Sequence, residues 1–117
     1  METLRYVVLH HEQIAEPHFD FMFEYEPGSD LITWRFPIWP ITQVTRVTEL
    51  GKHRRHYLDY EGPVSGDRGT VRRVAAGPCL VQHMNDGWMV TLLNDSRRPT
   101  VMISLQDPAA SLASLLT

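Results

Sequence analysis

The chain has 117 residues, 43 % of them hydrophobic, which is the size and composition of one domain with one core. We therefore expect a single domain over residues 1–117. A formal net charge of −3 excludes a globally basic nucleic-acid-binding protein. The single cysteine, Cys79, excludes an internal disulfide and is typical of a reducing cytoplasm, where we expect the protein to reside. No apolar run has the length of a membrane span, so we expect no membrane partner.

Short stretches rich in β-branched and aromatic residues recur along the chain and predict strands. They lie at residues 4–9, 17–25, 31–36, 41–50, 70–74, 79–83, 88–93 and 100–105, and residues 53–61 are extended but highly polar. This spacing predicts an all-β fold, either an antiparallel barrel or a sandwich, and about eight strands suit a compact barrel. Asp107-Pro108 predicts the start of a short C-terminal helix over residues 109–116.

The strand at residues 17–25 carries the most informative pattern. Phe19, Phe21, Phe23 and Tyr25 share one side and face a core, while the other side holds His18, Asp20, Met22 and Glu24. An imidazole and a carboxylate two residues apart stand about 7 Å apart along a strand and can lean toward one ion. Such a pair is a common ligand set for Mn, Fe or Zn. The alternative is a half-buried strand whose polar side is only solvated.

A local excess of positive charge lies between positions 46 and 73. This window holds seven basic residues against four acidic ones, an excess of three, and it includes Arg46, Arg55 and His53. Arginine suits bidentate phosphate binding, and a nearby histidine suits acid–base chemistry. The alternative is a solvated polar edge that discourages strand pairing. Earlier in the chain, only one of the neighbours His10 and His11 should point into a site, because adjacent strand residues face opposite ways.

These motifs resemble the 3′-phosphoesterase domain found at the N-terminus of bacterial DNA ligase D and its stand-alone relatives. The matching residues are Tyr6-Val7-Val8, His10-His11, His18-Phe19-Asp20-Phe21-Met22-Phe23-Glu24, Trp34-Arg35-Phe36-Pro37, His53, Tyr57, Asp59-Tyr60-Glu61-Gly62 and Gly69-Thr70-Val71. They follow one another in the family's order and span about residues 5–75. The last forty residues match only loosely.

The resemblance implies a compact β-barrel and a manganese-dependent hydrolase that trims 3′ ends of DNA or RNA primer strands in DNA repair. It implies His11, His18 and Asp20 as metal ligands, with Mn²⁺ as the cofactor and Zn²⁺ or Co²⁺ as alternatives. The implied partners are nucleic acid 3′ ends and separate ligase or polymerase proteins.

The resemblance also implies roles around the metal. His53 and Tyr57 are expected to be catalytic with support from Glu24, and Arg46 and Arg55 are expected to bind substrate.

Two cationic positions of the family pattern are lost, where arginine and lysine give way to Met22 and Ile38, and Arg55 and Arg35 are the candidates to replace them. An alternative function is therefore a non-catalytic, metal-containing module that binds DNA ends or a repair partner.

Overall fold

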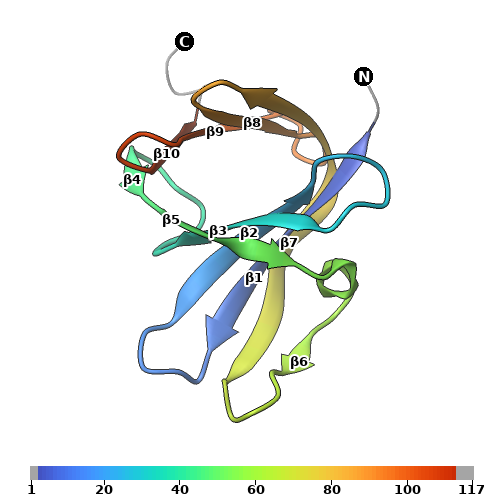
Figure 1. Ribbon diagram of the computed structural model, residues 1–117, viewed down its shortest axis with the longest axis vertical. Helices are drawn as coiled ribbons and strands as arrows, with labels where there is room; N and C mark the ends of the chain where they lie inside the picture. The colour runs from blue at the N-terminus through green and yellow to red at the C-terminus, as the bar shows by residue number, and fades with distance from the viewer. Residues whose placement is uncertain (1–2, 113–117) are drawn as a thin grey trace.

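The computed structural model describes residues 3–112, which form a ten-stranded antiparallel sheet (Figure 1). The strands are β1 (Leu4–Glu12), β2 (His18–Glu24), β3 (Leu31–Phe36), β4 (Thr45–Arg46), β5 (Thr48–His53), β6 (Gly62–Pro63), β7 (Thr70–Met84), β8 (Gly87–Leu92), β9 (Thr100–Ser104) and β10 (Ala109–Leu112). A single-turn 3-10 helix, η1 (Arg55–Leu58), follows β5. The prediction of an all-β, antiparallel fold is confirmed. Within the described range, no helix has both the length and the apolar character that crossing a bilayer requires.

The sheet curls around its core without closing into a hydrogen-bonded barrel. Its strand order is β4-β10-β9-β8-β7-β1-β2-β3-β5, with β6 paired to β7 beside this path. In the described chain, the edge strands β4 and β5 do not pair with each other; they are consecutive, with Val47 between them. The Val47 N–H donates to the Pro108 carbonyl (3.0 Å), and its side chain is buried. The predicted closed barrel is therefore corrected, because a bent segment of chain joins the two edges in place of a ladder.

The two sides of β1 and β2 pack against different groups of apolar residues. One side faces the main core, which includes Tyr6, Val8, Phe21, Phe23, Trp34, Phe36, Trp88, Val90, Val101 and Ile103. The other side faces a minor core of Val7, Leu9, Met22, Leu31, Leu58 and Val71. Because successive strand residues point to opposite sides, each strand contributes to both cores.

The polar side of β2 is buried, so the predicted half-exposed strand is wrong in this respect. His18, Asp20 and Glu24 are 7 %, 6 % and 4 % exposed, although the alternation of sides is as predicted. Tyr25, predicted to face the core, lies beyond the strand and is 36 % exposed. The cover over the polar side comes from η1 and the segment after it, through Leu58 and its neighbours, which the local pattern of β2 could not reveal.

The predicted C-terminal helix is wrong where the structure describes it. Residues Ala109–Leu112 form β10, with Ala110 opposite Ile103 of β9 and Thr45 of β4. Asp107 has a φ of +50° and lies in a turn, so it does not cap a helix. Pairing on both sides and complete burial of Ala110 outweigh the local helix propensity of this segment. Residues 113–116 of the predicted helix lie outside the described residues.

The extended segment predicted at residues 53–61 is interrupted by η1. Leu58 is 2 % exposed, and the turn of η1 carries it into the minor core against β1. Burial of one leucine in an otherwise polar stretch therefore accounts for the local helical conformation of the backbone.

The two strands predicted at residues 70–74 and 79–83 are parts of one long strand, β7. Pro78 lies opposite Arg5 of β1, and its carbonyl still accepts a hydrogen bond from the Leu93 N–H (3.0 Å). The proline therefore removes one backbone N–H donor from β7 but does not end the strand. The hairpin turn predicted at residues 85–87 is confirmed, since Met84 pairs with Gly87.

Burial on both sides of β2 predicts similar costs for shortening neighbouring side chains. Phe21→Ala is expected to lower the free energy of unfolding by about 3–5 kcal/mol and Met22→Ala by about 2–5 kcal/mol. Urea denaturation measures both. Val44→Ala is the control, because Val44 is 71 % exposed and should change stability by less than about 0.5 kcal/mol. A Met22→Ala loss as small as that of the control would contradict the buried minor core.

Candidate metal centre

The register of β1 and β2 brings three potential metal ligands together. His11 lies directly opposite His18, and Asp20 follows His18 by two residues on the same side of β2. One ligand atom from each of His11, His18 and Asp20 lies within 4.8 Å of the others. The sequence predicted this set, and the structure shows that it can hold a metal ion.

His18 and Asp20 present buried polar atoms that lack protein partners. His18 Nδ1 donates to the Glu16 carbonyl (3.0 Å), which leaves Nε2 with a lone pair directed at the cluster. His18 Nε2 lies 3.4 Å from Asp20 Oδ1. In residues 3–112, four buried side-chain atoms have no hydrogen-bond partner, and these two are among them. Buried polar atoms almost always have a hydrogen-bond partner. The unpartnered His18 Nε2 and Asp20 Oδ1 therefore fit a site that binds a cation.

His11 is held by the loop that precedes β7. Its Nε2 donates to the Arg68 carbonyl, so Nδ1 is the nitrogen left for a metal. Gly69 allows this loop to approach, because its φ is +81° and a Cβ there would lie 2.3 Å from the Glu12 carbonyl oxygen. The neighbouring His10 stacks on Phe19 on the opposite side of the sheet (4.4 Å between ring centroids). The prediction that only one of the two histidines enters the site is confirmed.

The cluster opens into a cavity of about 270 Å³, the metal cavity, whose lining includes the histidine and the tyrosine predicted to be catalytic. Its lining residues are Leu9, His11, Asp20, Met22, Arg35, Leu50, His53, Tyr57, Val64, Arg68 and Val71. These residues come from β1, β2, β3, β5, η1 and β7 and from the loop before β7. Residues as far apart in the sequence as Leu9 and Val71 therefore share one site.

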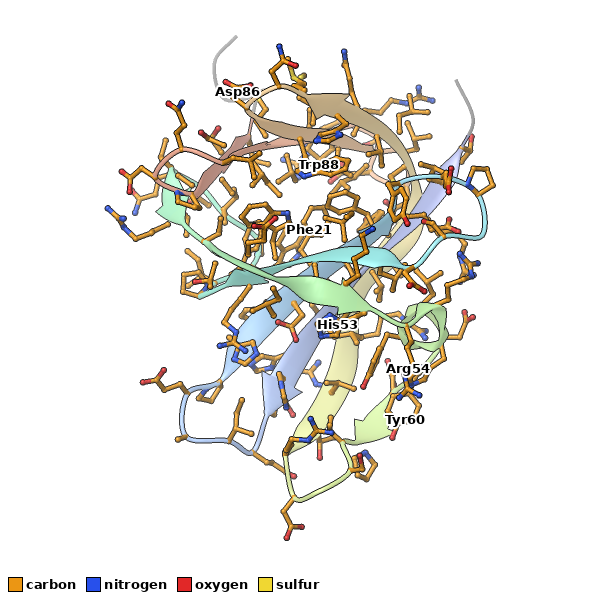
Figure 2. All side chains as sticks on the ribbon, in the orientation of Figure 1. Phe21, His53, Arg54, Tyr60, Asp86 and Trp88 are labelled. Carbon is orange, nitrogen blue, oxygen red and sulfur yellow. The ribbon has the colours of Figure 1, made fainter. Side chains whose placement is uncertain are left out.

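His53 ends β5 at the cavity with one ring nitrogen fixed. Its Nδ1 donates to the Gly51 carbonyl (2.8 Å), which leaves Nε2 able to take or give a proton. The His53 and Tyr57 rings pack edge to face, with centroids 5.8 Å apart. Figure 2 shows His53 on one side of the β5 ribbon and the core residues Phe21 and Trp88 on the other. The arrangement offers an oriented imidazole beside a candidate metal site.

Glu24 and Arg55 lie apart from this cavity and bind each other. Arg55 Nη1 donates to Glu24 Oε2 and to the Ser29 carbonyl (3.0 Å). Glu24 also accepts from the backbone N–H groups of Arg5 (2.7 Å) and Gly28 (3.2 Å). Glu24 is four residues beyond Asp20, about 13 Å along the strand. Both residues therefore sit at the opposite end of β2 from the histidines, in a structural ion pair.

The pKa of Glu24 reflects two opposing effects. Burial raises it, but hydrogen bonds from Arg55 and from the two N–H groups together lower it by more, so the pKa of this carboxyl lies below its ordinary value. The carboxylate form is therefore the one that the fold stabilises.

Arg46 lines a second hollow of about 390 Å³ next to the metal cavity, together with Glu16, Pro17, His18, Arg35, Pro37 and Thr48. Its guanidinium pairs with Asp107 Oδ1 (2.7 Å), and both side chains are largely exposed. Arg35, which with Arg55 was a candidate to replace the missing cations, and Arg68, which the motifs did not single out, line the metal cavity itself. The alternation of β3 in the sequence contained a signal for Arg35, because it is a polar residue between the buried Trp34 and Phe36.

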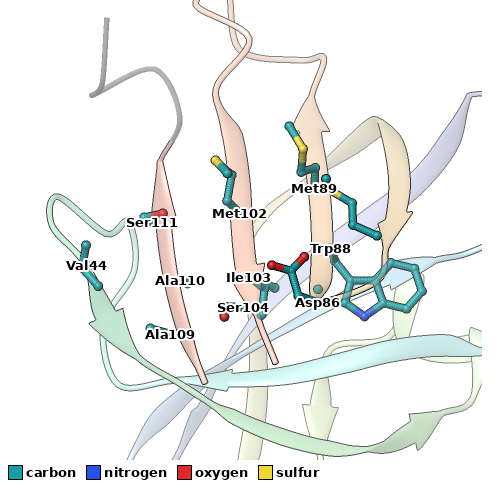
Figure 3. Close-up of a pocket in the computed structure, with 12 residues that line it drawn as sticks. Val44, Asp86, Trp88, Met89, Met102, Ile103, Ser104, Ala109, Ala110 and Ser111 are labelled. Atoms are coloured by element: carbon teal, nitrogen blue, oxygen red, sulfur yellow. The ribbon is translucent and has the colours of Figure 1, made fainter. Parts of the chain in front are cut away.

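Two hollows with larger volumes share no lining residue with the metal cavity. One of about 290 Å³ lies over β8, β9 and β10, where Met89 and Met102 line it (Figure 3). Another of about 780 Å³ is lined by Tyr6, Trp39 and Leu92 among others. Both linings are mainly apolar, so the reactive side chains gather at the metal cavity instead.

Comparison with models of known protein families finds no match, and comparison with curated proteins finds none either. The likeness to ligase D phosphoesterase domains therefore rests on the motif residues alone. The donor set itself fits a divalent metal, because two imidazole nitrogens and a carboxylate oxygen suit Mn²⁺, Zn²⁺ and Co²⁺.

Adding metal to chelator-stripped protein is expected to raise its melting temperature. A metal that binds only the folded state adds about 2.7 kcal/mol of stability at a free concentration of 100 Kd. Thermal melts with Mn²⁺, Zn²⁺ and Co²⁺ measure the shift. His18→Ala should abolish it, whereas His83→Ala should keep it, because His83 stacks on Trp88 away from the cluster. The absence of a shift with all three metals would eliminate the site.

The Glu24 ion pair predicts acid-sensitive stability. A carboxyl whose pKa is lowered by folding contributes stability above its unfolded pKa, near the ordinary value of 4.5, and loses it as pH falls through the lower folded value. Glu24→Gln should destabilise the protein by about 1–3 kcal/mol at pH 7 and flatten the fall in stability below pH 4.5. Urea denaturation from pH 7 to pH 3 tests this. An unchanged pH profile in the variant would assign the acid sensitivity to other carboxyls.

Proposed function

We propose that this protein is a metal-dependent phosphoesterase that acts on 3′ ends of nucleic acid. The observation that carries the proposal is the cavity in which His11, Asp20, His53 and Tyr57 meet beside the buried His18. A cluster of metal ligands and an oriented imidazole in one cavity are the parts that metal-dependent hydrolysis of a phosphate ester requires. The motif resemblance supplies the substrate class, which is a 3′-phosphate on a DNA or RNA primer strand.

His11, His18 and Asp20 hold the metal in this proposal, with Mn²⁺ as the cofactor. The bound metal supplies Lewis acidity to a phosphoryl oxygen. The second ring nitrogens of His11 and His18 donate to backbone carbonyls, which fixes the orientation of both rings. The chain thereby holds its ligands in place through the backbone of the loop before β2 and the loop before β7.

His53 is the acid–base or phosphate-contacting group in the proposal. The Gly51 carbonyl fixes its Nδ1 proton, so its Nε2 is the atom available to the substrate. Tyr57 packs against the His53 ring and lines the same cavity, so its role is to position His53 or to contact substrate. Glu24 and Arg55, in contrast, serve the fold through their ion pair.

A second candidate function is a non-catalytic module that binds nucleic acid ends. It is favoured by the apolar part of the cavity lining, where Leu9, Met22, Leu50, Val64 and Val71 stand among the reactive groups. Met22 in particular offers no charge to a phosphate. Such a module would still bind metal and strand ends, and turnover separates the two functions.

The phosphoesterase proposal predicts phosphate release from a 3′-phosphorylated primer strand in the presence of Mn²⁺. His53→Ala should fold, keep the Mn²⁺ thermal shift, and lose at least about 100-fold in rate, the usual scale of general acid–base catalysis. A colorimetric phosphate assay and gel mobility of the strand measure the release. His83→Ala is the matched control and should release phosphate at the native rate.

A Mn²⁺-loaded native protein that releases no phosphate would overturn the enzyme and favour the end-binding module. A His53→Ala variant with native turnover would instead remove His53 from the mechanism.

A further inference from the structure

Arg35 occupies a position that the motif-based site does not explain. It lies on β3 directly opposite Asp20 of β2 in the antiparallel register. Directly opposite residues of paired strands project from the same side of the sheet, about 4.5–5.5 Å apart at Cβ. Arg35 therefore places a basic side chain next to the Asp20 carboxylate, on the same side of the sheet, while Leu9 lies opposite Asp20 on the other neighbouring strand.

The Arg35 guanidinium differs from those of the nearby arginines, which hydrogen-bond or form ion pairs with other residues of the protein. Arg68 donates to the Ser65 carbonyl (2.8 Å) and hydroxyl (3.3 Å), and Arg46 pairs with Asp107. Arg55 is held by Glu24. Among residues 3–112, the exposed Arg35 side chain has no hydrogen bond and no ion pair, even to Asp20 across the strand.

Arg35 also lies where two hollows meet. It lines the metal cavity with His11, Asp20 and His53, and it lines the second hollow with His18 and Arg46. An anion that reaches the cluster from either hollow therefore meets this guanidinium. On β2, the position two residues after Asp20 on the same side holds the apolar Met22. The positively charged side chain beside the cluster therefore comes from Arg35 of β3 and not from β2.

We propose that Arg35 binds the terminal phosphate of the substrate strand beside the metal cluster. A guanidinium can donate two parallel hydrogen bonds to phosphate oxygens, which a thioether at position 22 cannot do. Asp20 is engaged by the metal in this arrangement, and Arg35 remains available to the phosphate. The inference rests on the proposed function, since it assigns the phosphate-binding residue of that same site.

The test compares two DNA oligonucleotides that differ only in ending with a 3′-phosphate or a 3′-hydroxyl. Fluorescence anisotropy with Mn²⁺ measures binding in the His53→Ala background, where the phosphate stays on the strand, and a gel confirms that the probe is intact. Adding Arg35→Ala should weaken binding of the phosphorylated strand by about tenfold or more. The hydroxyl strand should lose much less, and Arg35→Lys should recover part of the preference.

Arg97→Ala is the matched control, because it removes the same charge from the lining of a different hollow. It should leave the preference for the 3′-phosphate unchanged. All variants are also melted with Mn²⁺, and Arg35→Ala should keep the native thermal shift. Loss of that shift in Arg35→Ala would overturn the inference, because Arg35 would then support the metal cluster rather than the phosphate.

If Arg35→Ala keeps the full preference for the phosphorylated strand, and if Arg35→Ala with His53 intact releases phosphate at the native rate, the inference is overturned. The phosphoesterase proposal then stands. Arg35-dependent phosphate binding by a protein without turnover overturns the phosphoesterase and supports the inference. No preference for the 3′-phosphate in the His53→Ala background, together with no phosphate release by the protein that retains His53, overturns both.

Discussion

The antiparallel register between β1 and β2 is the constraint on which the candidate site depends. It sets His11 opposite His18 and Leu9 opposite Asp20, so that the two histidines and the carboxylate share one side of the sheet. A shift of one residue would carry each of these side chains to the other side. The register is held by the aromatic and aliphatic residues of the same strands, since Phe21 and Val8 must face the main core while Met22 and Leu9 face the minor core.

Burial on both sides of β2 gives the cluster its chemical character. A buried imidazole nitrogen and carboxylate oxygen without hydrogen bonds are costly, and a cation is the partner that satisfies both at once. The cover over this side comes from η1 and the loop before β7, which also bring Tyr57 and the Arg68 carbonyl to the site. The same packing therefore buries His18 and Asp20 and assembles the residues around them.

The ends of β2 have different tasks, although their polar residues follow one alternating pattern. His18 and Asp20 at the first end face the cavity, while Glu24 at the other end accepts hydrogen bonds from Arg55 and two backbone N–H groups. Four residues of extended chain separate Asp20 from Glu24, which is too far for one ion to contact both. The resemblance predicted a supporting role for Glu24, and the structure places its support in the turn after β2 and in η1.

The sequence by itself determined the all-β class, most strand positions and the pair of candidate ligands His18 and Asp20, because period-two alternation and the His-x-Asp spacing are local properties. The third candidate ligand, His11, came from the family resemblance. It did not determine that the sheet stays open, that residues 109–112 form a strand, or that the polar side of β2 is buried. Those outcomes depend on partners far along the chain: β4 and β9 for Ala110, and Leu58 for Met22. Tertiary structure likewise decided that Arg35, and neither Arg46 nor Arg55, stands beside Asp20, because cross-strand register is not encoded within any single strand.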